Sequence, residues 1–304
     1  MTEFFITAAI ALLLDFYLKS HWQFKPFDWF RVWVDSIEQR FNGGTRSQGI
    51  GAVLVATLPI VIGVLIIRFV LYAIMPFLAF LFDVAVLYFC LGFNRLYTRS
   101  TAVYESLEAG NMIEANERLR RLARRGAASE TESSISHTTV EALLKQGNNN
   151  VIATLFWFGV LGPLGAVMQR LVRILDNKWG HQDARFAEYG WLAARLDDVI
   201  GWIPARLTAV GYAIMGSFED AMHCWRKQVS IWKDINSGPL LSSGLGAMHM
   251  QDCDTGNDGE SCEIVETNAG HVRRATALVL RVLIFWMMIA LLMAFAEVMG
   301  VIGS

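Results

Sequence analysis

Charged residues are scarce in this chain. Asp, Glu, Lys and Arg make up 18% of its 304 residues, whereas soluble domains carry roughly 25%. Hydrophobic residues reach 54%, the mean hydropathy is +0.38, and the apolar residues are concentrated in a few long runs. A formal net charge of −2 gives no electrostatic reason to expect a nucleic-acid partner. These values predict an integral membrane protein.

Cysteine motifs, a cleavable signal and a metal loop are also missing. The four cysteines include no C-x-x-C pair, which weighs against a zinc ribbon or a redox motif. Glu3 precedes the first apolar run, where a cleavable signal would carry positive charge, so we expect a retained membrane segment. The acidic segment 251–268 has Asn257 where an EF-hand needs glycine, so we predict a flexible loop and no metal site. Cys253 and Cys262 in this loop are either a disulfide, if the loop faces an oxidising compartment, or free thiols.

Five apolar runs are candidate membrane segments, because about 20 apolar residues span a bilayer as a helix. They lie at residues 4–18, 50–68, 73–93, 151–168 and 275–297. The run 151–168 contains glycines and a proline, so a re-entrant segment packed against protein is an alternative to a crossing. We predict an all-α, polytopic helical membrane protein with about four to six membrane segments, amphipathic and cytoplasmic helices, and a single domain, 1–304.

The polar segments between the apolar runs set the expected topology. Lys and Arg are frequent in the excursion 94–150 and in the helical polar region 170–250, and the hairpin Tyr72–Pro76 has neither. The positive-inside rule therefore predicts that most charged excursions are cytoplasmic. This assignment makes the chain multi-pass, with the lipid bilayer as its constant partner.

Four ionisable residues fall within or near the ends of the apolar runs: Asp15, Arg68, Asp83 and Arg281. A carboxylate at membrane depth is costly and is often functional. Asp83 is therefore either a functional acid, an acid paired with a cation such as Arg68, or a protonated acid inside the helix bundle. Asp15 lies either inside the membrane or at its interface, facing water.

The stretch Trp191–Thr208 reads W-L-A-A-R-L-D-D-V-I-G-W-I-P-A-R-L-T. It sets charged residues among apolar residues at helical spacing: Arg195, Asp197, Asp198 and Arg206. Arg195 and Asp198 are three residues apart, so they share a helix face and can pair. Pro204 predicts two helical pieces joined at a kink. The charges form either a polar binding site or a structural ion-pair lock, and the residues alone leave both open.

The segment Thr154–Thr208 resembles the membrane-bound adenosylcobinamide-phosphate synthases, the CobD/CbiB family. Elements of that family, A-P-L-F-W, Y-R-x-x-N-T-L-D, R-Y-x-x-F-G and A-R-L-D-D…P-A-R-L-T-A, correspond in order to Ala153–Trp157, Gln169–Asp176, Arg185–Gly190 and Ala194–Ala209. The resemblance implies one set of polar residues that would line a ligand pocket: Arg121, Arg125, Glu141, Arg170, Asp176, Arg195, Asp197, Asp198, Arg206 and Asn236.

The chain departs from the family where acids are expected. The synthases carry I-E-x-x-x-E-N-x-x-D-G, in which Glu141 matches, but the second Glu, the Asn, the Asp and the Gly are replaced by Lys145, Gln146, Asn149 and Asn150. The N-T-L-D motif reads R-I-L-D from Arg173. A ligase that activates a carboxylate with ATP needs acids to hold magnesium. These exchanges weigh against ligase chemistry.

This pattern is similar to AmpE, a related inner-membrane protein encoded in the β-lactamase induction locus. The resemblance implies a non-catalytic protein of the bacterial inner membrane, with a signalling or regulatory role linked to β-lactamase induction and cell-wall recycling. The resemblance implies that the chain has no catalytic residue and no cofactor. It also implies that the chain binds a small anionic ligand or a membrane-protein partner. A homo-oligomer is an open alternative. Two other functions stay open: a ligase of cobalamin biosynthesis that uses ATP and Mg, and a scaffold or chaperone for another membrane protein.

Overall fold

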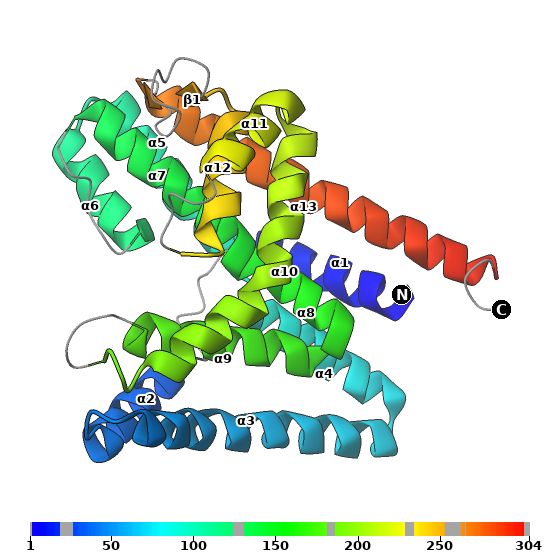
Figure 1. Cartoon of the computed structure of the whole chain (residues 1–304). Coiled ribbons are helices and arrows are strands. Elements are labelled where there is room, and N and C mark those ends of the chain that lie inside the picture. Colours follow the sequence, from blue (N-terminus) through cyan, green and yellow to red (C-terminus); the bar gives the residue numbers. More distant parts are fainter. Residues whose placement is uncertain are drawn as a thin grey trace. The chain divides into compact units, whose positions relative to one another are not determined.

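The computed structural model describes residues 2–18, 27–123, 131–180, 186–228, 234–252, 263–264 and 266–300. Helices form nearly all of its regular structure (Figure 1), which confirms the predicted all-α class. The chain divides into two compact units. Unit 1 comprises Met1–Leu91, Ala153–Gly201 and Glu297–Ser304, and unit 2 comprises Gly92–Ile152 and Trp202–Ala296.

Unit 1 contains α1 (Thr2–Tyr17), α2 (Asp28–Phe41), α3 (Arg46–Ile74), α4 (Pro76–Cys90), α8 (Ala153–Leu161), α9 (Pro163–Trp179) and the first part of α10 (Trp191–Met215). Helices α3 and α4 form a hairpin that turns at Met75, and α9 packs against both of them. Helix α1 packs against α4 and α8, and α2 packs against α3. The core of this unit is therefore the surface that α9 shares with the α3–α4 hairpin.

Unit 2 contains α5 (Phe93–Glu108), α6 (Met112–Ala123), α7 (Glu132–Gly147), a π-helical turn η1 (Asn148–Ile152), the rest of α10, α11 (Phe218–Gln228), α12 (Ser237–Ala247) and most of α13 (Ala269–Val298). Two short strands, β1 (Gln251–Asp252) and β2 (Glu263–Ile264), pair antiparallel. Helix α7 packs against α5, α6 and α12, and all of its residues 139–144 are buried. It is the central helix of this unit.

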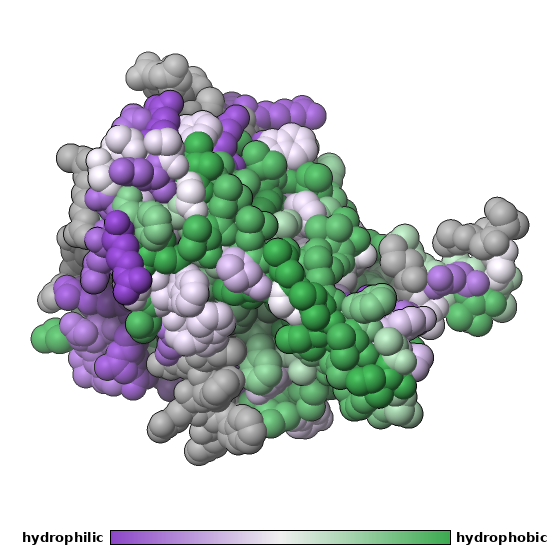
Figure 2. Space-filling model, turned by 90° about the horizontal axis from the view of Figure 1, so that it is seen from below, coloured by the Kyte–Doolittle hydropathy of each residue, from purple (hydrophilic) through white to green (hydrophobic). Residues whose placement is uncertain are grey.

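Three helical stretches are long and apolar enough to cross a membrane: Arg46–Ile74, Pro76–Glu108 and Ala269–Val298. Large apolar side chains on them are exposed, such as Leu58 and Phe69 on α3. Hydrophobic residues cover much of the face that Figure 2 shows. Soluble monomers rarely expose an apolar surface of this extent, so this apolar surface is the one that lipid covers. The predicted helical membrane protein is confirmed.

Two of the predicted membrane segments form shorter helices. Residues 4–17 belong to α1, which has 16 residues. The run 151–168 is interrupted at Gly162, whose φ of 64° favours glycine, and Pro163 then begins α9. The run is therefore not one continuous helix. Whether it re-enters the membrane, and whether the chain acts as the single domain 1–304, stay predictions.

The prediction of two helical pieces at Pro204 was wrong, because α10 is one helix from Trp191 to Met215 with Pro204 inside it. Proline has no N–H, so the carbonyl of Ile200, one turn earlier, loses its helical donor. The indole Nε1 of Trp157 donates a hydrogen bond to this carbonyl at 3.0 Å. This replacement donor gives a physical reason why the helix continues.

Candidate functional site

The predicted site residues fall into two groups, one in each unit. Unit 1 holds five of them on α9 and α10: Arg170, Asp176, Arg195, Asp197 and Asp198. Unit 2 holds four on α6, α7, α10 and at the start of α12: Arg121, Glu141, Arg206 and Asn236. Arg125, Cys253 and Cys262 lie outside the described residues.

Helices α9 and α10 share an ion cluster of Arg173, Asp176 and Asp197, here called the α9–α10 cluster. Nη1 of Arg173 donates to Oδ2 of Asp197 at 2.5 Å and lies 3.6 Å from Oδ2 of Asp176. The three side chains are only 19% to 27% exposed. Charges that are partly removed from water interact more strongly than charges on an open surface. Arg173 therefore holds both acids and ties α9 to α10.

Arg173 was not predicted as a site residue, because it stands where the synthase motif has asparagine. The available signal was its spacing of three residues from Asp176, which places both on one face of a helix. Arg195 was predicted, and it is exposed on α10. Its pairing with Asp198 stays a prediction.

Other contacts of α9 fix its position in unit 1. The guanidinium carbon of Arg170 lies 5.9 Å from the centre of the Phe27 ring, a cation–π contact. Nζ of Lys178 donates to Oδ1 of Asp35 on α2 at 2.6 Å. The basic side chains of this helix are thus held from several sides, which orders the surface that carries the α9–α10 cluster.

In unit 2, residues aligned with the acidic synthase motif form the end of α7 and the turn η1. Asn150 donates to Oε1 of Gln146 at 3.4 Å, and Oδ1 of Asn148 accepts from the Thr208 hydroxyl at 2.9 Å. Asn148 and Thr208 are both buried. Amide side chains both donate and accept, so they stabilise this turn without charge. Turns of the π type are frequent at functional sites.

An acid that the sequence did not predict, Asp234, lies near Lys145 at the end of α7. Its carboxylate accepts from the backbone N–H of Asn236 at 2.9 Å and from the hydroxyl of Ser237. Burial raises the pKa of Asp234, but these hydrogen bonds, a bond from the Ser237 amide and the charge of Lys145 together lower the pKa below its ordinary value. Its sequence signal is the run D-I-N-S before a helix, which is typical of an N-terminus.

The other predicted residues of unit 2 have separate surroundings. Glu141 is buried in α7, with Oε1 3.8 Å from Nδ1 of His137. The guanidinium of Arg206 stacks over the ring of Trp202 at 4.0 Å. Arg121 is exposed on α6. Glu141 thus shares α7 with Lys145, and this helix leads directly into η1, whereas Arg121 and Arg206 lie on other helices.

The residues predicted near the apolar runs also have defined places. Asp83 pairs with Arg68, whose Nε lies 3.1 Å from Oδ1, which is one of the three alternatives that the sequence left open. Asp15 is half-buried on α1, and Arg281 is exposed on α13. Within the described part of the chain, no group of three or more His, Cys, Asp or Glu side chains could hold a metal ion.

The Asp234→Asn variant should lose less stability in acid than the wild type. The pKa of Asp234 is lowered on folding, so the ionised carboxylate stabilises the fold above its ordinary pKa of 3.8. This contribution is lost as the pH falls through the lower pKa of the folded state. Thermal unfolding in detergent, followed from about pH 6 to about pH 2, measures the difference. Glu108→Gln, an exposed acid of the same unit, is the matched control; equal acid profiles for wild type and Asp234→Asn would contradict the assignment.

Comparison with known proteins gives one family. The model described as CobD/Cbib protein matches residues 8–251. A protein named "Cobalamin biosynthesis protein CobD" from Stutzerimonas stutzeri is 36% identical over 248 residues, which cover 80% of this chain and 80% of the relative. A protein of the same name from Chromobacterium violaceum is 37% identical over 174 residues, 57% of this chain and 56% of the relative. No solved structure matches.

These relatives contradict the predicted non-catalytic role of AmpE type, because they are named for cobalamin biosynthesis. The prediction of a signalling role in β-lactamase induction was therefore wrong. Lys145 stands where the synthases have an acid, and this exchange weighed against ligase chemistry. The structure instead gives Lys145 an ionised neighbour, Asp234, so the local balance of charge is not reversed.

Proposed function

Because the chain belongs to the CobD/CbiB family, we propose that it is an ATP-dependent, amide-forming ligase of cobalamin biosynthesis, an adenosylcobinamide-phosphate synthase. The observation that carries this proposal is the family match over residues 8–251, together with 36% identity to a relative over 80% of both chains. The matched range includes the α9–α10 cluster, η1, Lys145 and Asp234.

The charges of unit 1 support a role in binding a nucleotide and its metal ion. Phosphoryl transfer asks a protein mainly for positioning and for charge stabilisation. Arg170 and Arg173 are candidate ligands of the transferring phosphate. Mg²⁺ usually takes one or two carboxylates together with phosphate oxygens. Asp176 and Asp197 would therefore suffice for magnesium that arrives with ATP, without a metal site built from protein alone.

The polar groups of unit 2 suit the substrates that are joined. In this reaction a carboxylate oxygen takes a phosphoryl group from ATP and ADP leaves; the amine nitrogen then attacks the acyl carbon, and phosphate leaves with the proton of the amine. Lys145 can neutralise an anionic substrate group, and the amides of η1 offer further donors. Asp234 is a candidate partner for the ammonium of the amine substrate before it reacts.

We place the protein in the bacterial inner membrane with its charged segments in the cytoplasm, where ATP is available. The distribution of Lys and Arg supports this orientation, since the hairpin Tyr72–Pro76 has none. A fusion of alkaline phosphatase at this hairpin should be active only if the hairpin lies outside the cytoplasm.

Expression of this chain should restore cobalamin-dependent growth to a bacterial strain that lacks its adenosylcobinamide-phosphate synthase. The null strain lacks only this one enzyme, so a chain with the proposed ligase activity is sufficient to restore growth. The synthase-null strain with an empty vector is the negative control, and the Stutzerimonas stutzeri relative is the positive control. Failure to restore growth, with the chain shown by immunoblot to be abundant in membranes, would overturn the proposed function.

A further inference from the structure

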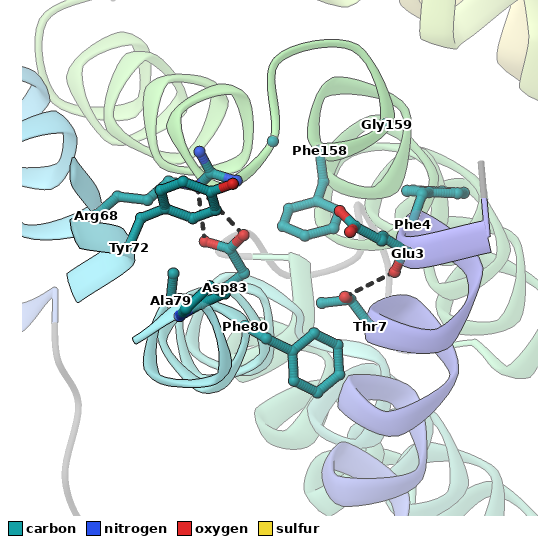
Figure 3. Close-up of a pocket in the computed structure, with 12 residues that line it drawn as sticks. Glu3, Phe4, Thr7, Arg68, Tyr72, Ala79, Phe80, Asp83, Phe158 and Gly159 are labelled. Atoms are coloured by element: carbon teal, nitrogen blue, oxygen red, sulfur yellow. Dashed lines mark hydrogen bonds and ion pairs between the residues drawn. The ribbon is translucent and has the colours of Figure 1, made fainter. Parts of the chain in front are cut away.

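A cavity in unit 1 is distinct from the α9–α10 cluster, because none of the cluster's residues lines it. It has a volume of about 220 Å³ and lies among α1, the α3–α4 hairpin and α8 (Figure 3). Three charged residues, Glu3, Arg68 and Asp83, line it together with aromatic side chains. A water occupies roughly 30 Å³ of liquid. The cavity therefore has room for a small polar group, but not for a whole lipid or a nucleotide.

The charges of this cavity are arranged as one ion pair and one further acid. Nε of Arg68 donates to both carboxylate oxygens of Asp83, at 3.1 and 3.2 Å. Within the described part of the chain, Arg68 pairs with Asp83 through Nε, and its side chain is 45% exposed, so both Nη groups can reach a ligand. The carboxylate of Glu3, at the start of α1, faces the same space in Figure 3. Since Arg68 and Asp83 balance each other, Glu3 leaves the cavity with a net negative charge.

The depth of the ion pair indicates where its ligand would come from. Arg68 lies about 9 Å along the axis from the end of α3 at Ile74, and Asp83 lies about 10 Å from the start of α4 at Pro76, at 1.5 Å per residue. The headgroup regions make a bilayer roughly 10–15 Å thicker than its hydrocarbon core. Each face accounts for half of this, roughly 5–8 Å, so a hairpin turn at the membrane surface puts both residues a few ångströms below the boundary between headgroups and acyl chains. An arginine side chain is long enough to reach lipid phosphates from that depth.

We propose that this cavity binds the headgroup of an ethanolamine phospholipid. The guanidinium of Arg68 suits a phosphate, to which it presents two parallel N–H groups. The primary ammonium of ethanolamine can donate hydrogen bonds to Glu3, whereas the methylated ammonium of choline cannot. A purely anionic headgroup would meet the net negative charge that Glu3 provides. Leu65 and Phe69 of α3 do not line the cavity, but they are exposed apolar side chains near Arg68 in the sequence and are available to the acyl chains of such a lipid.

Native mass spectrometry of the full chain tests the proposal. Protein in detergent is mixed with equal amounts of phosphatidylethanolamine, phosphatidylglycerol and phosphatidylcholine of the same acyl chains. The ethanolamine lipid should be retained roughly tenfold more than either of the others, as expected when one charge-assisted hydrogen bond differs. Equal retention of the three lipids would overturn the proposal.

Two variants localise the binding. Arg68→Gln should reduce retention of the ethanolamine lipid roughly tenfold, whereas Arg281→Gln, an exposed arginine of α13 outside the cavity, should leave it unchanged. Glu3→Gln changes an exposed residue and keeps the ion pair intact. It should lower retention of the ethanolamine lipid to that of the choline lipid. Equal losses in Arg68→Gln and Arg281→Gln, or full preference in Glu3→Gln, would contradict the site.

The same chemistry could come from a free amino-alcohol phosphate, so a further measurement separates the two sources. Free phosphoethanolamine is titrated against the protein loaded with the ethanolamine lipid. If the lipid is the ligand, millimolar phosphoethanolamine should displace little of it, because the acyl chains add apolar contact that the free compound lacks. Complete displacement at equal concentration would overturn the assignment to a lipid. The result of this titration does not depend on growth complementation, so the lipid site and the ligase function can each be contradicted without the other.

Discussion

The Arg173→Gln variant should be destabilised by about 2–3 kcal/mol and should no longer support growth of a synthase-null strain. The physical reason is that the single positive charge of Arg173 is shared between Asp176 and Asp197, whose side chains are 25% and 19% exposed. Removing the cation leaves two acids that are close together and poorly hydrated. Their repulsion acts directly between α9 and α10.

Unfolding midpoints in detergent, followed by tryptophan fluorescence, measure the first part of this prediction. Arg195→Gln is the matched control, since Arg195 is exposed on α10. The double variant Arg173→Gln/Asp197→Asn removes the repelling charge and should regain most of the stability but not the growth. If Arg173→Gln and Arg195→Gln have the same midpoint, the α9–α10 cluster does not hold the two helices together. If the double variant also restores growth, the cluster is structural and Arg173 does not bind phosphate.

Gly49→Ala should destabilise the protein by about 3 kcal/mol or more, while Gly51→Ala on the same helix should be neutral or stabilising by about 0.5–1 kcal/mol. A Cβ at Gly49 would lie 2.0 Å from the carbonyl oxygen of Tyr189, which is backbone and cannot rotate away. Tyr189 is itself buried and packs edge-on against Trp179, with ring centres 5.2 Å apart. At Gly51 a Cβ would meet nothing within 4 Å.

The two alanine variants control for each other, because they change helix propensity equally on one helix of unit 1. Protease resistance in detergent and the unfolding midpoint should separate them by many degrees. A small difference would mean that α3 can move away from the segment before α10 at little cost. That result would contradict the close packing of Gly49 against Tyr189.

Some of this structure could be predicted from the sequence because it depends on local pattern. The apolar run 50–68 lies within α3, since hydropathy alone decides which helix lipid can cover. The pairing of Arg68 with Asp83 was one of the alternatives, because a short hairpin brings its two helices back alongside each other. In both cases the deciding residues are close in sequence.

The rest could not be predicted because it depends on packing between distant segments. The bond from Arg173 to Asp197 needs the Arg173 side chain of α9 to reach the first part of α10, and the synthase motif has asparagine at this position. Asp234 became a candidate only when the start of α12 was seen to lie near the end of α7. The functional prediction gave a few exchanges around Lys145 more weight than the framework on both sides, and the relatives named for cobalamin biosynthesis corrected it.

The hydrogen bond from Trp157 to Ile200 has an evolutionary consequence. Where residue 204 is proline, the indole is the donor that its helix lacks; where residue 204 has an amide hydrogen, the same indole competes with that amide for one oxygen. The effect of changing Trp157 thus depends on the identity of a residue in another motif. The two positions should show epistasis, so a lineage that exchanges one of them gains little until it exchanges the other.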